Sequence, residues 1–222
     1  MPREDYQQRL DGLRDDVIDM SDLVLERYRA SLEALEEKDE EMARRIIEGD
    51  AEINEMYLDI EQDCVDLIAL QQPVAGDLRL IAASFKIITD LERVADLATN
   101  LGDYTLDAER DRFPGVDVQE LGAFAASMVK DAVRAYETED ADLCHDVAES
   151  DDVLDARCEE ASRRIIRCLI DDTADRQEAE DVIRDATCLF LTIRDLERVG
   201  DHAVNIAART LYMVENDDEL IW

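Results

Sequence analysis

The stretch FKIITDLERVADLATN, residues 85–100, recurs in the same chain as FLTIRDLERVGDHAVN, residues 190–205. The two copies share a Phe, an Ile, the run Asp-Leu-Glu-Arg-Val and, further on, an Asp, an Ala and an Asn at the same places. A chance match would not preserve so many positions over so short a length. The chain is therefore one structural unit used twice.

In the first copy a line of apolar side chains leads into a pair of acids. An α-helix turns by about 100° per residue, so side chains three or four positions apart share a face. Ile81, Phe85 and Ile88 thus share a face with Glu92 and Asp96. The pattern predicts that these two carboxylates continue an inward-facing line.

The second copy has the same pattern, with Glu197 and Asp201 in the place of the acid pair. The aspartate that opens each Asp-Leu-Glu-Arg-Val run, Asp90 or Asp195, falls on roughly the opposite side of its helix. We expect both to point away from the acid pairs. His202 cannot share a face with its neighbour Asp201, and we expect it at the surface or in a groove.

The composition favours helices and excludes several classes of partner. Of the 222 residues, 46% are hydrophobic but only 5% are aromatic, and glycine and proline are few. The formal net charge of −34 repels nucleic acid and anionic lipid, so neither is expected as a partner. The negative charges of the chain also repel one another, and salt screens this repulsion. This leads to the hypothesis of a salt-rich, halophilic cytoplasm.

The cysteines and the hydropathy pattern indicate a cytoplasmic protein. The five cysteines are odd in number and show no Cys-x-x-Cys spacing, which is typical of small buried residues in a reducing compartment. No basic leader and no apolar run of membrane-spanning length are present, so we expect no export and no direct membrane insertion. Any role at a membrane then requires a protein partner.

Hydrophobic periodicity predicts an all-α fold of six long helices in two antiparallel three-helix bundles in tandem. The breaks between helices fall at Glu37–Asp39, Gln71–Pro73 and Glu139–Asp140, and the Pro-Gly pair of residues 112–115 is a linker. We assign residues 1–111 to the first repeat, 112–116 to the linker and 117–222 to the second repeat. The expected helices are 3–37, about 40–71, about 75–109, 117–138, 140–170 and one that starts after 173 and ends near 214.

Antiparallel packing should bring acids of neighbouring helices to one level. In the first repeat, Asp50 and Asn54 lie as far before the second turn as Glu92 and Asp96 lie after it. In the second repeat the matching residues are Asp151 and Asp155. Their distance in residues before the turn differs by about one helical turn from the distance of Glu197 and Asp201 after it. We predict two metal sites, formed by Asp50, Asn54, Glu92 and Asp96, and by Asp151, Asp155, Glu197 and Asp201.

Oxygen ligands of this kind suit a hard cation such as Mg, Ca or Mn, and accept Fe or Zn. The alternatives are acids on a solvated helix face, and salt bridges with Arg93 or Arg198. A di-iron bundle built on Asp142 and His145 lacks the required further ligands. No phosphate loop, nucleophile elbow or Ser/His/Asp set is present, so no enzyme is expected.

The chain resembles the PhoU family of phosphate-uptake regulators, as an acidic, haloarchaeal-type member. The resemblance rests on ARRIIEGD at residues 43–50, Gln72-Pro73 with DLRL at 77–80, and the segments DLERVAD and DLERVGDHAVNIA. It implies a commonly dimeric protein with multinuclear metal clusters on acid-x-x-x-Asp motifs. Three motifs of this chain match that form, while Asp50-x-x-x-Asn54 departs from it by an amide.

The resemblance further implies an adaptor that binds the ATPase subunit of the phosphate ABC transporter and a sensor kinase, and restrains uptake when phosphate is plentiful. Two other functions stay open from the residues. One is a metal-storing or metal-dependent hydrolytic bundle, and the other is a pure dimerisation scaffold.

Overall fold

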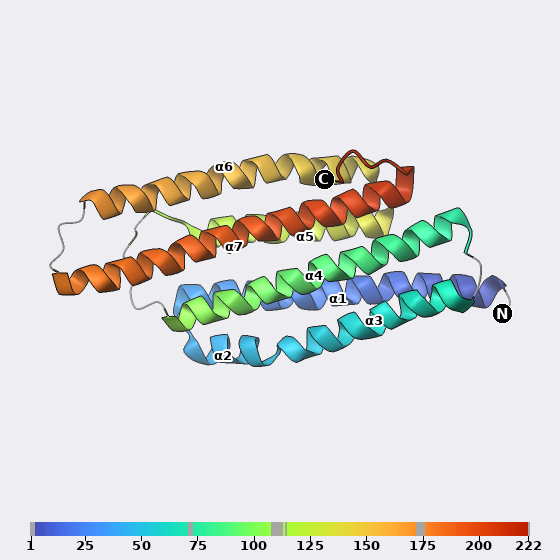
Figure 1. Cartoon of the computed structure of the whole chain (residues 1–222), viewed down its shortest axis with the longest axis horizontal. Helices are drawn as coiled ribbons and strands as arrows, with labels where there is room; N and C mark the ends of the chain where they lie inside the picture. Colours follow the sequence, from blue (N-terminus) through green and yellow to red (C-terminus); the bar gives the residue numbers. More distant parts are fainter. Residues whose placement is uncertain (1–2, 71–72, 108–112, 114, 172–175, 222) are drawn as a thin grey trace.

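The computed structural model describes residues 3–70, 73–107, 113, 115–171 and 176–221, and in these ranges the chain forms seven α-helices and no strand (Figure 1). The first bundle contains α1, α2, α3 and α4, and the second contains α5, α6 and α7. The predicted all-α fold of tandem bundles is confirmed. The bounds are α1 Arg3–Glu37, α2 Glu40–Glu48, α3 Asp50–Leu70, α4 Ala75–Asp107, α5 Val118–Thr138, α6 Ala141–Asp171 and α7 Arg176–Glu215.

The second rod of the first bundle is interrupted, so the single helix predicted from about residue 40 to 71 is wrong in this detail. Its break lies at Gly49, between α2 and α3. The guanidinium of Arg27 donates a hydrogen bond to the Gly49 carbonyl and another, of 2.9 Å, to the Glu52 carboxylate. Glycine is a weak helix former, and the Gly49 carbonyl accepts hydrogen bonds from Arg27 and, at 3.2 Å, from the backbone N–H of Glu52.

The two bundles share one contiguous core. Its buried side chains come from both halves of the chain, for example Leu91 and Val94 from α4 and Leu196 and Val199 from α7. Helices α4 and α7 run antiparallel through the middle of the molecule, and α1 packs against α5 (Figure 1). The repeated stretch therefore lies at the centre of the molecule in both halves.

Gly122 lets α5 approach α1 closely. A Cβ atom at this position would lie 2.5 Å from Cδ2 of Leu32, closer than two such atoms approach in proteins. One turn away, Nε2 of Gln119 donates a hydrogen bond of 2.7 Å to the Leu32 carbonyl oxygen. The contact between the bundles at this point depends on the absence of a side chain at residue 122.

Four of the cysteines are buried, Cys168 is half-buried, and all five are free thiols, as expected from their spacing. In the described part of the chain, no helix combines the length and the apolar character needed to cross a membrane.

Candidate functional site

The first predicted cluster lies between the start of α3 and the middle of α4. Nδ2 of Asn54 donates a hydrogen bond of 2.8 Å to Oδ2 of Asp50, so the amide and the carboxylate of α3 already form a pair. Burial raises the pKa of Glu92, and the negative charges of Asp96 and Asp50 raise it further. Burial and then Asp50 raise the pKa of Asp96 as well. Residues of α3 and α4 therefore act on one another across the hairpin, at the level that the sequence predicts.

The second cluster is more strongly perturbed. Burial, followed by the charges of Asp155 and Asp201 and more weakly of Glu197, raises the pKa of Asp151 to about 6. Burial and the neighbouring acids raise the pKa of Asp155 and of Glu197 in the same way. The two acid pairs lie at unequal numbers of residues from the turn between α6 and α7, but this difference does not separate them in space. All four carboxylates lie within electrostatic reach of one another.

Asp151 also has a buried oxygen that lacks a donor. Within the described residues, its Oδ1 has no hydrogen-bond partner. A Cβ atom at residue 200 would lie 3.0 Å from this oxygen, so Gly200 leaves room beside it. Buried polar atoms in proteins are nearly always satisfied, and a bound cation is one way to satisfy a carboxylate oxygen. The donor set of the second cluster therefore fits a cation.

Ion pairs with arginine do not account for the clusters. Among the ion pairs of the described residues none includes any of the eight predicted ligands. Arg198 lies 3.7 Å from Asp195, and the charges of Arg198 and Arg93 act on Asp96 only as weaker influences that lower its pKa. In the same part of the chain no three acid, histidine or cysteine side chains already form a ligand-like group. Metal binding by the eight residues therefore stays a prediction.

The expectation that Asp90 points away to the opposite side is correct, but that side is the interface with α7. Asp90 is only 7% exposed, and its Oδ1 lies 2.9 Å from Nδ1 of His202 and accepts a hydrogen bond of 3.2 Å from Nδ2 of Asn205. His202 is buried, so its predicted surface or groove position is wrong. The contact between α4 and α7 covers the histidine, which a view of one repeat alone does not show.

Asp195 occupies the mirror position on α7. It is completely buried and accepts hydrogen bonds from the Tyr104 hydroxyl at 2.8 Å and from Nδ2 of Asn100 at 3.2 Å. Arg194 pairs with its other oxygen at 2.9 Å. The Asp-to-Asn contacts are reciprocal. Asp90 of the first repeat bonds with Asn205 of the second, and Asp195 of the second bonds with Asn100 of the first. These polar groups join the bundles, and the recurrence of both residue types in the two copies is the sequence signal that could have found them.

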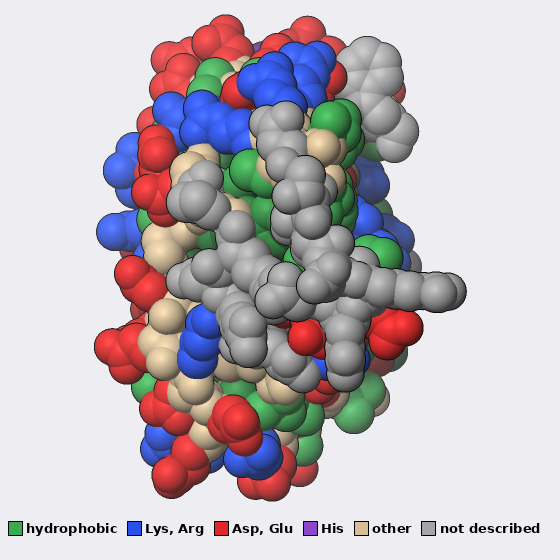
Figure 2. All heavy atoms as spheres, turned by 90° about the vertical axis from the view of Figure 1, so that its left-hand side faces the viewer, with side chains coloured by type: hydrophobic (Ala, Val, Ile, Leu, Met, Phe, Trp, Pro, Cys, Tyr) green, Lys and Arg blue, Asp and Glu red, His purple; other side chains and the backbone are tan. Residues whose placement is uncertain are grey.

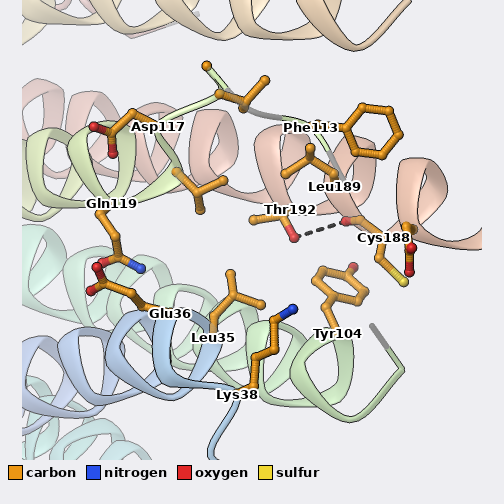
Figure 3. Close-up of a pocket in the computed structure, with 14 residues that line it drawn as sticks. Leu35, Glu36, Lys38, Tyr104, Phe113, Asp117, Gln119, Cys188, Leu189 and Thr192 are labelled. Atoms are coloured by element: carbon orange, nitrogen blue, oxygen red, sulfur yellow. Dashed lines mark hydrogen bonds between the residues drawn. The ribbon is translucent and has the colours of Figure 1, made fainter. Parts of the chain in front are cut away.

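A cavity of about 420 Å³ lies elsewhere, between the ends of α1 and α4 and the start of α5 (Figure 3). Lys38 and Tyr104 line it on one side, and Leu189 and Thr192 of α7 line it on the other. Its charged side chains are of mixed sign, and it includes none of the eight predicted ligands. The cavity is thus separate from the two carboxylate clusters.

Fold and clusters together define a class of protein: a pair of three-helix bundles with one carboxylate cluster on each bundle. Comparison with known proteins gives the family. Residues 17–105 and 118–210 each match the PhoU domain. The chain belongs to the PhoU domain family, as its motifs suggest.

Relatives in bacteria and archaea match almost the whole chain. A protein of Pseudomonas putida named phosphate-specific transport system accessory protein PhoU homolog is 33% identical over 97% of this chain and 82% of its own length. A protein of Methanothermobacter thermautotrophicus, named homolog 1 of the same accessory protein, is 31% identical over 96% of this chain and 95% of its own.

Solved structures agree with the fold. PhoU from Pseudomonas aeruginosa has a TM-score of 0.86 at 31% identity and aligns with 96% of this chain and 100% of its own. The phosphate transport system regulatory protein PhoU from Streptococcus pneumoniae has a TM-score of 0.85 at 27% identity, over 96% and 98% of the two chains. These likenesses support a role in the regulation of phosphate transport.

Proposed function

We propose that this chain is a cytoplasmic adaptor that restrains high-affinity phosphate uptake by contact with other proteins, without catalysis. The observation that carries the proposal is the match of both repeats to proteins named as accessory proteins of phosphate transport. The residue pattern agrees, since it contains no arrangement typical of nucleophilic catalysis.

The expected partners are the ATPase subunit of the phosphate ABC transporter and a sensor kinase, and the chain is expected to form a homodimer. Since no described helix can cross a membrane, contact with a transporter would go through one of its exposed subunits. A regulator of this kind shifts the balance between its bound partners. This requires that its conformational states bind a given partner with different affinities.

Metal binding at the two clusters is the proposed means of control. The first cluster would use Asp50, Asn54, Glu92 and Asp96, and the second Asp151, Asp155, Glu197 and Asp201. Bound there, a divalent or iron-type cation would neutralise the carboxylates and offer a position at which phosphate could bridge. The first cluster has an amide where the second has an acid, so we expect it to bind metal more weakly.

Phosphate uptake in cells of the source organism tests the function. Deletion of the gene should leave uptake high when phosphate is plentiful, and return of the wild-type chain should restrain it. Uptake that is the same with and without the chain in both phosphate conditions would contradict the proposal.

Metal analysis of the purified chain tests the clusters and separates adaptor from scaffold. Glu92→Gln and Glu197→Gln should each lower the bound metal, whereas Glu137→Gln, an exposed acid on α5, should leave it unchanged. Equal metal in all four proteins would remove the clusters as metal sites. Metal-dependent hydrolysis that is lost with Glu92→Gln or Glu197→Gln would favour the hydrolytic alternative instead.

A further inference from the structure

Exposed aliphatic side chains gather on the two helical hairpins that carry the carboxylate clusters. Such side chains on a protein surface are unremarkable singly, but a group of them marks an interaction surface. On α3 and around the start of α4 the exposed fractions are Leu58 58%, Val65 49%, Ile68 48%, Val74 59% and Leu78 44%. On α6 and the start of α7 they are Ile166 48%, Ile170 75% and Ile183 63%.

Four of these side chains lie on the same side of their helices as the clusters. On α3, Val65 and Ile68 point within about 60° of Asp50 around the helix axis. On α4, Leu78 lies within about 40° of Glu92, and on α7 Ile183 has the same relation to Glu197. Each hairpin therefore presents one face, with the carboxylates away from the turn and aliphatic side chains toward it. We call it the hairpin face.

Two of the aliphatic positions recur between the repeats, as the carboxylates do. Val65 corresponds to Ile166 at the offset of 101 residues that also relates Asp50 to Asp151. Leu78 corresponds to Ile183 at the offset of 105 that relates Glu92 to Glu197. A scatter of exposed residues would not repeat at the offsets of the two clusters. The two hairpin faces are versions of one surface.

The carboxylate clusters make part of each hairpin face negative, and the second face also has arginines near its turn. On the first face Asp50, Glu61, Glu92 and Asp96 lie on the cluster side of their helices. The second face has the acids of its own cluster, and near its turn the arginines of α6 stand beside acids, as in the pair Arg163–Glu159 at 2.5 Å. Figure 2 shows this end of the molecule, where basic side chains gather toward the top among acidic ones. Since both clusters are acidic in a chain of net charge −34, a second copy is a poor occupant.

We propose that each hairpin face docks an amphipathic helix of a partner protein, whose aliphatic stripe covers Val65 and Leu78 on one face or Ile166 and Ile183 on the other. The lysines and arginines of that helix lie beside the carboxylate cluster. This is the helix-on-apolar-surface mode of peptide recognition, with charge complementarity setting the orientation. The inference rests on the proposed adaptor function and specifies that its partners bind through an amphipathic, basic helix. One chain then offers two docking positions.

Binding of a synthetic peptide tests the proposal. The probe is an 18-residue fluorescent helix of leucine and lysine with one apolar stripe, and its affinity is measured by anisotropy at a fixed salt concentration. The control peptide has the same composition in an order that removes the stripe. The wild-type chain should bind the striped peptide at least about tenfold more tightly than the control, since leucine burial adds to the shared electrostatic attraction.

Variants of the chain locate the binding. Leu78→Ser with Ile183→Ser should weaken the striped peptide about tenfold, because each removes aliphatic surface from one hairpin face. Val153→Ser is the matched control: Val153 is 43% exposed on α6 but points away from the cluster, so affinity should not change. Circular dichroism checks that all three chains keep their helices.

Three results of the peptide and sedimentation measurements would overturn the proposal. The first is equal affinity for the two peptides, and the second is equal affinity of wild-type chain and the Leu78→Ser, Ile183→Ser variant. The third is a dimer, seen by sedimentation, that this variant alone converts to monomer, which would make a second copy the occupant. If the variant retains the transporter ATPase as well as wild type does, the docking proposal fails but the adaptor function stands. If wild type retains none, the adaptor function fails whatever the peptide does.

Discussion

Replacing Asp151 with Asn should stabilise the chain at neutral pH. Asp151 is half-buried, its pKa is raised to about 6, first by burial and then by the neighbouring acids, and its Oδ1 has no donor within the described residues. At pH 7 the folded chain therefore holds an ionised carboxylate in a place that disfavours the charge. Asn has nearly the same shape and no charge, so the variant removes this cost.

The magnitude follows from the pKa. A shift from the ordinary value of 3.8 to about 6 would correspond to roughly 3 kcal/mol if it were fully expressed. Because Asp151 is partly exposed and solvent screens its charge, we expect about 1–2 kcal/mol. Since the folded pKa is raised, the stability that protonated Asp151 contributes is present below pH 4 and is lost as the pH rises through about 6. The gain from Asp151→Asn should thus be full at pH 7 and absent at pH 4.

Urea denaturation at the two pH values, in metal-free buffer and at one salt concentration, measures this gain. Glu137→Gln, which removes an exposed acid of α5, is the control and should change the free energy of unfolding by only a few tenths of a kcal/mol. An Asp151→Asn chain that is less stable than wild type at pH 7, or more stable by the same amount at both pH values, would refute the reasoning.

Three further predictions concern the interface, the packing and the charge. Asp195→Ala should cost about 3 kcal/mol in urea denaturation and Tyr104→Phe about 1 kcal/mol, because the first removes a fully buried acceptor and leaves the half-buried donors of Asn100 and Tyr104 unpaired; equal costs would argue against the polar contact between the bundles. Gly200→Ala should cost about 1–3 kcal/mol, because its Cβ would lie 2.5 Å from Cδ2 of Leu154, whereas Gly12→Ala, with nothing within 4 Å, should stabilise by about 0.5–1 kcal/mol. The melting temperature should rise from low to molar KCl as screening relieves the self-repulsion of a chain with net charge −34, and a steady fall would contradict the salt hypothesis.

The internal repeat and the helical period were enough to predict most of the fold. The repeat set the number of bundles, and the apolar spacing placed the helix ends within a few residues of those observed for α1, α4, α5 and α7. The same counting placed Asp50 level with Glu92. These predictions succeed because they depend on local geometry and on the packing of neighbouring helices in one hairpin.

Contacts between the bundles could not be predicted in this way. A helical wheel of one repeat leaves Asp90 and Asp195 on a face with no assigned neighbour, which led us to expect both to point away. The structure covers that face with the central helix of the other bundle, and it buries His202 there too. The break at Gly49 was missed for a similar reason, since it depends on Arg27 of another helix.

The assignment of metal also lies beyond the sequence. Acids three or four positions apart are common on the helices of so acidic a chain, and only their recurrence on one line in both repeats singled out the eight residues. The raised pKa values of five of them, Glu92, Asp96, Asp151, Asp155 and Glu197, support the grouping, and the unpartnered oxygen of Asp151 supports a cation at the second cluster. Which cation fits depends on coordination that residue types alone do not specify.

The most direct test of the central claim is how much phosphate transporter ATPase subunit the immobilised chain retains from purified solution. The comparison is between wild type and a chain with Glu92→Gln, Asp96→Asn, Glu197→Gln and Asp201→Asn, each with and without added Mn²⁺. The account predicts retention by wild type that depends on the metal, and retention by the variant that does not respond to it. No retention by wild type in either condition, or the same response to metal in both chains, would contradict it.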